Sequence, residues 1–261
     1  MTTRVGQTRR TTTGAAAAAL LIGLLAACSG PPAATGTSAG SAVATSAAAP
    51  ATSGAVTAAA GYGTGACAPT TGAATPVLQF ADAFADCLDP GASYTATITT
   101  SEGPVVVQLD TDRTPIAANN FVNLARSGYY DDTRLFRTEA RTGIIQGGSP
   151  HTQNNRDPGP GYTIPDEGLP FSAADYAPGV IAMANSGPDS GGGQFFFLSQ
   201  PAGSYLGDPG AIGDSAGSYV VFGRTTQGLD VLQKISDLES PAGSSTPSRP
   251  VTIESVTITE S

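Results

Sequence analysis

The sequence predicts a mainly β domain, a closed antiparallel barrel with two helices, and three observations lead to that prediction. Glycine and proline are abundant, 33 and 20 of the 261 residues, which disfavours a helix-rich fold. Many short strand-like runs follow one another without the alternation of strand and helix that a parallel sheet requires. Closing such a sheet into a barrel leaves no exposed edge strand.

The domain, which we place at residues 93–261, opens with a hairpin. Residues Tyr94–Thr100 alternate between apolar and polar side chains, as a half-buried strand does. Ser101-Glu102-Gly103 is typical of a turn, and Val105–Leu109 is rich in β-branched residues. Two antiparallel strands are therefore expected at the start.

A helix with clear end signals follows the hairpin. Thr114 is a suitable N-cap, and Pro115 suits the first helical position. Phe121 and Leu124 repeat with helical spacing, and Gly128 can end the helix.

Short strand-like runs separated by loops rich in glycine and proline occupy the rest of the domain. They are Ile144–Gln146, Val180–Ala184, Gln194–Ser199 and Tyr219–Phe222. A second short helix is expected at Leu229–Ile235, before a last strand at Val251–Ile258. In that strand the apolar side chains switch from odd to even positions, which predicts a bulge.

The N-terminus predicts export and lipid attachment. Three arginines precede Ala15–Ala27, an apolar run that is too short for a resident membrane helix and is typical of an export signal. The run ends in Leu25-Ala26-Ala27-Cys28, which resembles the lipobox of bacterial lipoproteins. We therefore expect residues 1–27 to be a signal peptide and a lipid on Cys28 to anchor the protein at the cell membrane, facing the extracytoplasmic side. A secretory signal that happens to contain a cysteine is the alternative.

Two segments separate this anchor from the domain. Residues 28–66 consist almost entirely of Ala, Ser, Thr, Gly and Pro, so we expect a flexible tether. Residues 67–92 contain Cys67 and Cys87, which are expected to form a disulfide in an oxidising compartment. We interpret this segment as a disulfide-stapled lead-in with no chemistry of its own.

Composition and charge exclude several classes of function. One histidine and three cysteines leave too few ligands for a metal site built from several of them, and only His151 could activate a nucleophile. Beyond the three N-terminal arginines, 9 basic and 21 acidic residues give a net charge of −12, which repels nucleic acid. We therefore expect no metal, no cofactor and no nucleic-acid partner, and a monomer.

Seven short motifs between Tyr94 and Ile258 follow one another in a recognisable order. They are Asn120–Ala125 (NFVNLA), Tyr130–Arg137 (YDDTRLFR), Gln146–Gly148 (QGG), Gly161–Glu167 (GYTIPDE), Ala182–Pro188 (AMANSGP), Gly193–Phe196 (GQFF) and Val220–Gly223 (VVFG). Together they resemble the cyclophilin family of peptidyl-prolyl cis–trans isomerases. The resemblance implies a cyclophilin-like closed eight-stranded antiparallel β-barrel capped by two helices, in agreement with the pattern above.

The resemblance also implies a reaction that needs neither a nucleophile nor a proton transfer. Rotation about an X–Pro bond has a barrier of about 20 kcal/mol because the amide has partial double-bond character. A cationic donor aimed at the prolyl nitrogen favours the twisted state, in which that nitrogen regains its lone pair. By resemblance Arg137 is this donor, and Gln146 orients it and the substrate carbonyl. The alternatives are a surface ion pair for Arg137 and a structural amide for Gln146.

The substrate-binding residues are likewise implied by the resemblance. Asn185 matches the position whose backbone holds the peptide, Phe196 matches an apolar position beside the proline, and Tyr219 stands where the family has a histidine. The full set is Ile144, Ala184, Asn185, Ser186, Gln194, Phe196, Leu206 and Tyr219. The apolar members of this set could instead be ordinary barrel core.

Several positions depart from the family pattern. The spacing between Arg137 and Gln146 is one residue longer, and Gly143 stands where a phenylalanine usually forms part of the proline pocket. A phenylalanine at position 143 is therefore expected to restore a pocket wall. Tyr205 replaces the family's tryptophan, and we expect His151 to be solvated in a polar loop.

Two functions follow from these observations. The first is a peptidyl-prolyl cis–trans isomerase that assists the folding of exported proteins by acting on X–Pro segments of unfolded or exported chains. The second is a proline-segment binding module or holdase with little turnover. Gly143 and the longer loop favour the second function, whereas Arg137 and Gln146 favour the first.

Overall fold

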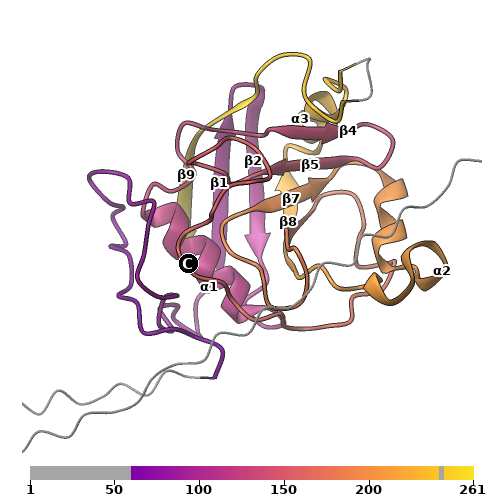
Figure 1. Cartoon of the computed structure of the whole chain (residues 1–261). Helices are drawn as coiled ribbons and strands as arrows, with labels where there is room; N and C mark the ends of the chain where they lie inside the picture. The colour runs from indigo at the N-terminus through magenta and orange to yellow at the C-terminus, as the bar shows by residue number, and fades with distance from the viewer. Residues whose placement is uncertain (1–59, 241–243) are drawn as a thin grey trace, which may run out of the picture. The chain divides into compact units, whose positions relative to one another are not determined.

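The computed structural model describes residues 60–240 and 244–261. The expected signal peptide, Cys28 and most of the expected tether lie outside these residues. The described residues form a curled antiparallel sheet with a helix at each of two opposite ends (Figure 1).

Nine strands make up the sheet. They are β1 (Tyr94–Thr100), β2 (Gly103–Leu109), β3 (Thr133–Arg134), β4 (Arg137–Glu139), β5 (Ile144–Gly147), β6 (Val180–Met183), β7 (Phe195–Leu198), β8 (Val221–Gln227) and β9 (Thr252–Glu260). Their order across the sheet is β3-β9-β1-β2-β8-β6-β7-β5-β4, and every neighbouring pair is antiparallel. The prediction of a mainly β, antiparallel domain is therefore confirmed.

The sheet differs from the expected closed eight-stranded barrel. Its two edge strands, β3 and β4, follow each other in the chain, and no strand pairing joins them within the described residues. Between them Leu135 is buried and its N–H donates to the carbonyl of Val251 at 2.9 Å. Two residues, Leu135 and Phe136, connect the edge strands, so chain connectivity joins the edges in place of a hydrogen-bonded ladder.

Strand β9 contains the bulge that its apolar pattern predicts. Thr99 of β1 lies opposite Ser255, whereas Thr100 lies opposite Ile253, so Glu254 is the extra residue. Both Ile253 and Val256 are buried as a result, while Glu254 faces solvent. Because of the bulge, apolar side chains at an odd position and at an even position of the same strand both face the buried side.

Two of the helices match the prediction. They are α1 (Pro115–Arg126) and α3 (Leu229–Ser236), which lie at opposite ends of the curled sheet (Figure 1). A short helix α2 (Pro209–Ile212) and the 3-10 turns Pro201–Gly207 and Gly213–Ser215 were not predicted. In the part of the chain that the structure describes, no helix is both long and apolar enough to cross a membrane.

The two ends of α1 are stabilised differently from each other. The N–H of Gly128, which has φ +69°, donates to the carbonyl of Ala125 at 2.9 Å, and the N–H of Tyr129 donates to the carbonyl of Leu124 at 3.0 Å. These two hydrogen bonds form a Schellman C-cap, so Gly128 ends the helix as expected. Thr114 occupies the N-cap position, but its hydroxyl contacts the carbonyls of Asp110 and Val221 and makes no cap. The distant Glu167 carboxylate accepts the free N–H of Ala117 at 2.6 Å instead.

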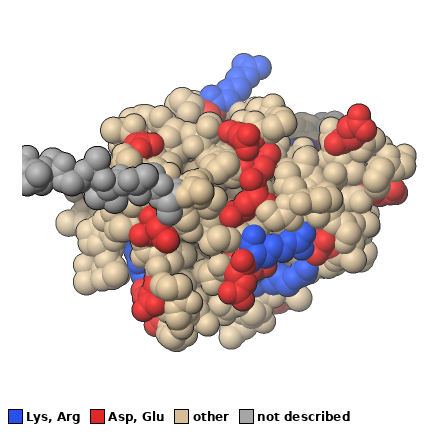
Figure 2. Space-filling view, turned by 90° about the horizontal axis from the view of Figure 1, so that it is seen from below, with Lys and Arg blue, Asp and Glu red and all other residues tan. Residues whose placement is uncertain are grey.

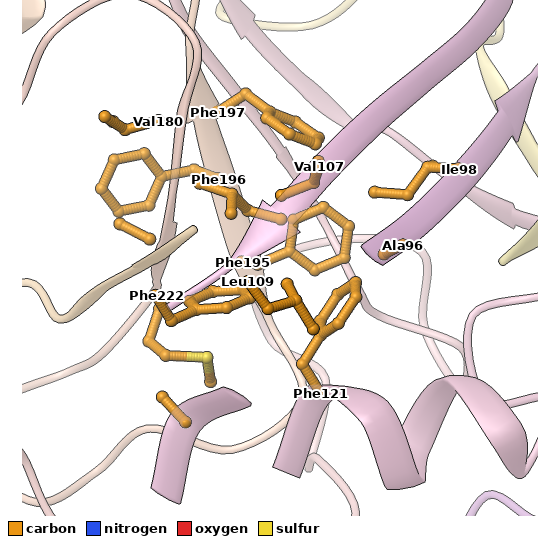
Figure 3. Packing of buried hydrophobic residues seen from close by; sticks show 14 of the residues in the cluster. Ala96, Ile98, Val107, Leu109, Phe121, Val180, Phe195, Phe196, Phe197 and Phe222 are labelled. Carbon is orange, nitrogen blue, oxygen red and sulfur yellow. The ribbon is translucent and has the colours of Figure 1, made fainter. Parts of the chain in front are cut away.

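The core lies between α1 and the concave side of the sheet. Phe121 points from α1 toward Phe195 and Leu109, and Figure 3 shows these side chains meeting beneath the strands. The rings of Phe121 and Phe195 are 5.6 Å apart and nearly perpendicular. Phe195 belongs to β7 and Leu109 to β2, so both strands have a rigid base, and β7 also carries residues of the site described below.

The lead-in packs against the opposite side of α1. Cys67 and Cys87 form a disulfide, and the segment that they enclose lies beside the helix (Figure 1). Asn119 accepts the N–H of Cys87 at 3.1 Å, and Asn123 accepts that of Ala68 at 2.9 Å. Residues 77–84 form neither helix nor strand apart from one bridge at Phe84, so packing on the domain sets their position.

Charged side chains are sparse on the face seen in Figure 2, and most of the basic ones adjoin acidic ones. Arg113 and Asp175 form an ion pair at 3.1 Å. Across the described residues acidic side chains outnumber basic ones, 21 to 9.

Removing the disulfide should weaken the fold. The double change Cys67→Ser, Cys87→Ser opens a loop whose ends are 20 residues apart, and the chain-entropy model predicts a loss of about 3 kcal/mol in the free energy of unfolding. Urea unfolding of the oxidised full-length protein measures the loss. The single change Cys28→Ser is the matched control and should leave the midpoint unchanged. An unchanged midpoint for the double variant would contradict the prediction.

Candidate active site

The pairing of β4 with β5 places Arg137 directly opposite Gln146. Arg137 Nη1 donates to Gln146 Oε1 at 2.9 Å, and Gln146 Nε2 donates to Gln194 Oε1 at 2.9 Å. Gln146 is buried. The three side chains thus form one hydrogen-bonded row in which Gln146 holds the arginine in place.

Glu139 also holds the arginine, and the sequence analysis did not single it out. Its Oε1 accepts Arg137 Nε at 3.0 Å and also accepts Nη2, while its Oε2 accepts the Thr142 hydroxyl at 2.9 Å. Residues two apart on a strand share a face, so the Arg-x-Glu spacing was the signal that could have revealed the pair. Thr142 belongs to the loop between β4 and β5.

The charge of Arg137 determines the ionisation of Glu139. Desolvation raises the pKa of Glu139, but the hydrogen bonds and positive charge of Arg137, aided by Thr142 and Ser245, outweigh it and hold that pKa below its usual value. The carboxylate therefore stays ionised at neutral pH. Of the five N–H groups of the guanidinium, two have no acceptor among the described residues.

A cavity of about 350 Å³ lies beside this arginine. Its lining includes both expected catalytic residues and the full expected substrate-binding set: Arg137, Ile144, Gln146, Ala184, Asn185, Ser186, Gln194, Phe196, Leu206 and Tyr219. The sequence analysis missed a second group from two loops: Asn155, Asp157, Pro158, Gly159, Pro160, Tyr162, Thr163, Ser190, Gly192 and Gly193. Tyr205, at the family's tryptophan position, also contributes to the lining.

Three adjacent strands bring the arginine next to an apolar surface. Strand order places β4, β5 and β7 side by side, and Gln146 pairs with Arg137 on one side and with Phe196 on the other. Phe196 and Leu206 are 5% and 4% exposed, so they are buried although they line the cavity. A cationic donor therefore stands beside buried apolar side chains that line the cavity.

Hydrogen bonds from neighbouring loops fix the other side of the cavity. The ring of Tyr219 lies edge-on to Phe196 at 5.5 Å, and the Tyr176 hydroxyl both donates to the carbonyl of Tyr219 at 2.8 Å and accepts its N–H at 3.1 Å. Asn185 Nδ2 donates to the carbonyl of Ser218 at 3.0 Å. The Asn185 side chain therefore braces the cavity wall.

The expectation for position 143 is wrong. Gly143 has φ +76°, and a Cβ there would lie 2.3 Å from the backbone nitrogen of Gln200. Its carbonyl accepts the N–H of Ser199 at 2.8 Å, which brings the two chains together. A phenylalanine could not enter the cavity from this position, and the neighbouring Ile144 lines the cavity instead.

His151 is exposed in a polar loop, as expected, and its ring also contacts a buried carboxylate. Its Nδ1 lies 2.9 Å from Asp157 Oδ1, and the Asp157 side chain is fully buried. Asp157 also accepts the backbone N–H groups of His151, Thr152 and Gly159. Desolvation raises the pKa of Asp157, but these hydrogen bonds outweigh it and lower that pKa overall. Asp157 thereby shapes one of the cavity loops.

Among residues 60–240 and 244–261, no group of three or more His, Cys, Asp or Glu side chains is arranged to hold a metal ion. What the cavity offers a ligand is a set of hydrogen-bond donors beside an apolar surface.

Comparison with known proteins identifies the family. Residues 95–258 match the family model described as "Cyclophilin type peptidyl-prolyl cis-trans isomerase/CLD". The chain belongs to the cyclophilin-type peptidyl-prolyl cis–trans isomerase family, because this match covers more than half of it.

Individual relatives agree with this assignment. Peptidyl-prolyl cis-trans isomerase-like 2 of Cryptococcus neoformans is 36% identical over 165 residues, which cover 62% of this chain but only 27% of that protein. Peptidyl-prolyl cis-trans isomerase CYP18-2 of Arabidopsis thaliana is 30% identical over 58% of this chain and 85% of its own length. Peptidyl-prolyl cis-trans isomerase-like 1 of Mus musculus is 34% identical over 54% of this chain and 78% of its own length.

A solved structure shares the fold. The crystal structure of a cyclophilin type peptidyl-prolyl cis-trans isomerase from Cryptosporidium parvum covers 64% of this chain and 98% of its own, with 27% identity and a TM-score of 0.51. A second crystal structure of that protein, in the presence of the dipeptide ala-pro, has a TM-score of 0.50.

Adding one methyl group at position 143 should destabilise the protein strongly. Gly143→Ala combines a left-handed backbone with the collision at Gln200. Gly159→Ala is the matched control, because Gly159 has φ +77° and a Cβ there would meet nothing within 4 Å. We expect the control to cost about 1–2 kcal/mol and Gly143→Ala to cost more, measured by urea unfolding. Equal losses would mean that the close approach to Gln200 relaxes freely.

Proposed function

We propose that this chain catalyses the cis–trans isomerisation of X–Pro bonds in segments of unfolded or exported proteins and so assists their folding. One observation carries the proposal. Arg137 is held by Gln146 and Glu139 at the edge of the cavity, next to the buried surface of Phe196 and Leu206. A proline ring seated on that surface would bring its nitrogen to the guanidinium.

The proposed chemistry is stabilisation of a twisted amide. In the planar ground state the prolyl nitrogen shares its lone pair with the carbonyl and is a poor acceptor. When the bond twists, the lone pair returns to the nitrogen, and an Arg137 N–H can donate to it. The interaction strengthens as the barrier is approached, which is the condition for raising the rate.

Preorganisation of the arginine supports this role. The Gln146 and Glu139 side chains accept three N–H groups of Arg137, and both acceptors are themselves held, by Gln194 and by Thr142. The guanidinium therefore needs little reorientation when a substrate arrives. Two N–H groups without an acceptor among the described residues supply the donors that the mechanism requires.

Glu139 also favours a second candidate function. Its ionised carboxylate offsets part of the positive charge of Arg137. A guanidinium whose positive field is reduced in this way would still bind a proline segment but would stabilise the twisted amide less. The second candidate is thus a proline-segment binding module or holdase with little turnover.

Replacing the arginine separates the two candidates. If Arg137 acts on the twisted amide, Arg137→Ala in the full-length protein should lower kcat/KM by roughly 10²–10³-fold and change peptide affinity much less. Exchange NMR on a short X–Pro peptide measures both quantities. Arg134→Ala is the control, because Arg134 is an exposed arginine on β3, at the opposite edge of the sheet from β4. Wild-type turnover no faster than that of Arg137→Ala would establish the binding module.

We further propose that the enzyme works at the extracytoplasmic side of the cell membrane, anchored by a lipid on Cys28. The support is the apolar run that ends in Leu25-Ala26-Ala27-Cys28 and the disulfide between Cys67 and Cys87, which suits an oxidising compartment. A flexible tether over residues 28–66 would span roughly 30–40 Å and hold the domain away from the bilayer.

The anchor has a direct test. Wild-type protein expressed with its own leader in a bacterial host should partition with membranes and show the mass of a lipidated N-terminal cysteine after cleavage. Cys28→Ser should lose both properties. Membrane partitioning and an identical mass adduct in the Cys28→Ser protein would contradict the anchor and leave a secretory signal as the explanation.

A further inference from the structure

A loop without regular structure contributes much of the second group of cavity residues. It comprises residues 158–163, here called the Tyr162 loop, and Pro158, Gly159, Pro160, Tyr162 and Thr163 all line the cavity. Since the loop is neither helix nor strand, contacts from elsewhere must set its position. The lead-in provides them.

Two phenylalanines of the lead-in pack on Tyr162. The rings of Phe80 and Phe84 meet the Tyr162 ring edge-on at 6.3 and 6.0 Å, and they meet each other at 4.9 Å. The N–H of Phe80 also donates to the carbonyl of Pro160 at 2.7 Å. The lead-in therefore fixes both the backbone and the aromatic side chain of the loop.

The backbones of the two segments approach closely at Gly161. This residue has φ +102°, and a Cβ there would lie 2.1 Å from Gln79 Nε2 and 2.5 Å from the carbonyl oxygen of Phe80. Glycine is required for this contact. The lead-in thus touches the loop at three consecutive residues, 160–162.

Helix α1 connects the same loop to a second part of the cavity wall. The Tyr162 hydroxyl donates to Asn120 Oδ1 at 2.6 Å, and Asn120 Nδ2 donates to the carbonyl of Gly192 at 2.7 Å. Asn120 is 2% exposed, and Gly192 lines the cavity. Burial raises the pKa of the Tyr162 hydroxyl, so it remains a donor over the physiological pH range.

Hydrogen bonds from α1 hold both ends of the disulfide-closed segment on this helix. Asn119, one residue before Asn120, accepts the N–H of Cys87. Asn123, three residues after Asn120, accepts the N–H of Ala68. Asn119 Nδ2 also donates to the carbonyl of Ala85 at 2.9 Å. One face of α1 therefore carries both ends of the stapled segment and the residue that anchors Tyr162.

We infer that the lead-in is part of the substrate-binding site, with Phe80 as a positioning residue that fixes Tyr162 and thereby the affinity for peptide residues beyond the X–Pro pair. The inference rests on the proposed function for the class of substrate. An X–Pro dipeptide needs only Arg137 and the apolar wall, whereas a longer segment reaches the Tyr162 loop. The lead-in precedes residues 95–258, the part that matches the family model.

The test compares a long and a short ligand in the full-length protein. Phe80→Ala should raise the KM and the Kd for a hexapeptide containing X–Pro by roughly three- to tenfold, the effect of losing edge-on aromatic contacts. It should leave kcat within about twofold, because Arg137 is untouched. Affinity for the dipeptide Ala-Pro, measured by NMR titration, should stay unchanged.

Matched variants separate positioning from general destabilisation. Val77→Ala changes a side chain of the same segment that is 43% exposed, and it should behave as wild type. Phe80→Tyr keeps the ring and should have the hexapeptide affinity of the wild type. The double variant Cys67→Ser, Cys87→Ser should lower hexapeptide affinity as Phe80→Ala does.

Unchanged hexapeptide affinity in Phe80→Ala overturns the inference, and so does an equal loss of affinity for the dipeptide. Absence of wild-type turnover would refute the proposed catalysis alone, since the Kd comparison still reports on Phe80.

Discussion

Helix α1 is buried on both sides, and this burial is the constraint on which the rest of the structure depends. One side packs Phe121 against the sheet, and the other carries the buried amides of Asn119, Asn120 and Asn123. Buried amides without hydrogen-bond partners are costly, so each must be satisfied inside the protein. Their partners are the backbone of the stapled lead-in and the wall of the cavity. The same requirement therefore places the lead-in on the helix and connects both to the cavity beside Arg137.

The register of three short strands provides the second constraint. Arg137, Gln146 and Phe196 stand in a row across β4, β5 and β7, so that donor, orienting amide and apolar surface are neighbours. A slip of one residue would turn Gln146 to the opposite face of the sheet and separate it from Arg137. Glu139 lies two residues from Arg137 on β4, on the same face of the strand, and its charge modulates the group that the proposed mechanism uses. In the proposed mechanism, the rate therefore depends on the balance between preorganisation and partial neutralisation of one guanidinium.

Local signals in the sequence predicted the elements whose causes are local. The phase switch in Val251–Ile258 predicted the bulge, and Gly128 predicted the end of α1, because each depends on a few adjacent residues. Strands β3 and β4 were missed because they are two and three residues long and are held by pairing with distant strands. Strand β8 extends to Gln227, beyond the expected Phe222, because its polar end pairs with β2.

The sequence by itself determined the family, the mainly β antiparallel fold and the residues that gather around the cavity, because motifs and apolar alternation record these directly. Only the tertiary structure decided what surrounds them. It placed the carbonyl of Gly143 against Ser199, which leaves no room for a larger side chain there, and it placed Glu139 on Arg137. It also brought Phe80 onto Tyr162, 82 positions later in the chain, through a helix that belongs to neither segment. Contacts of this kind depend on which surfaces remain to be buried after the sheet has curled, and no local pattern encodes that.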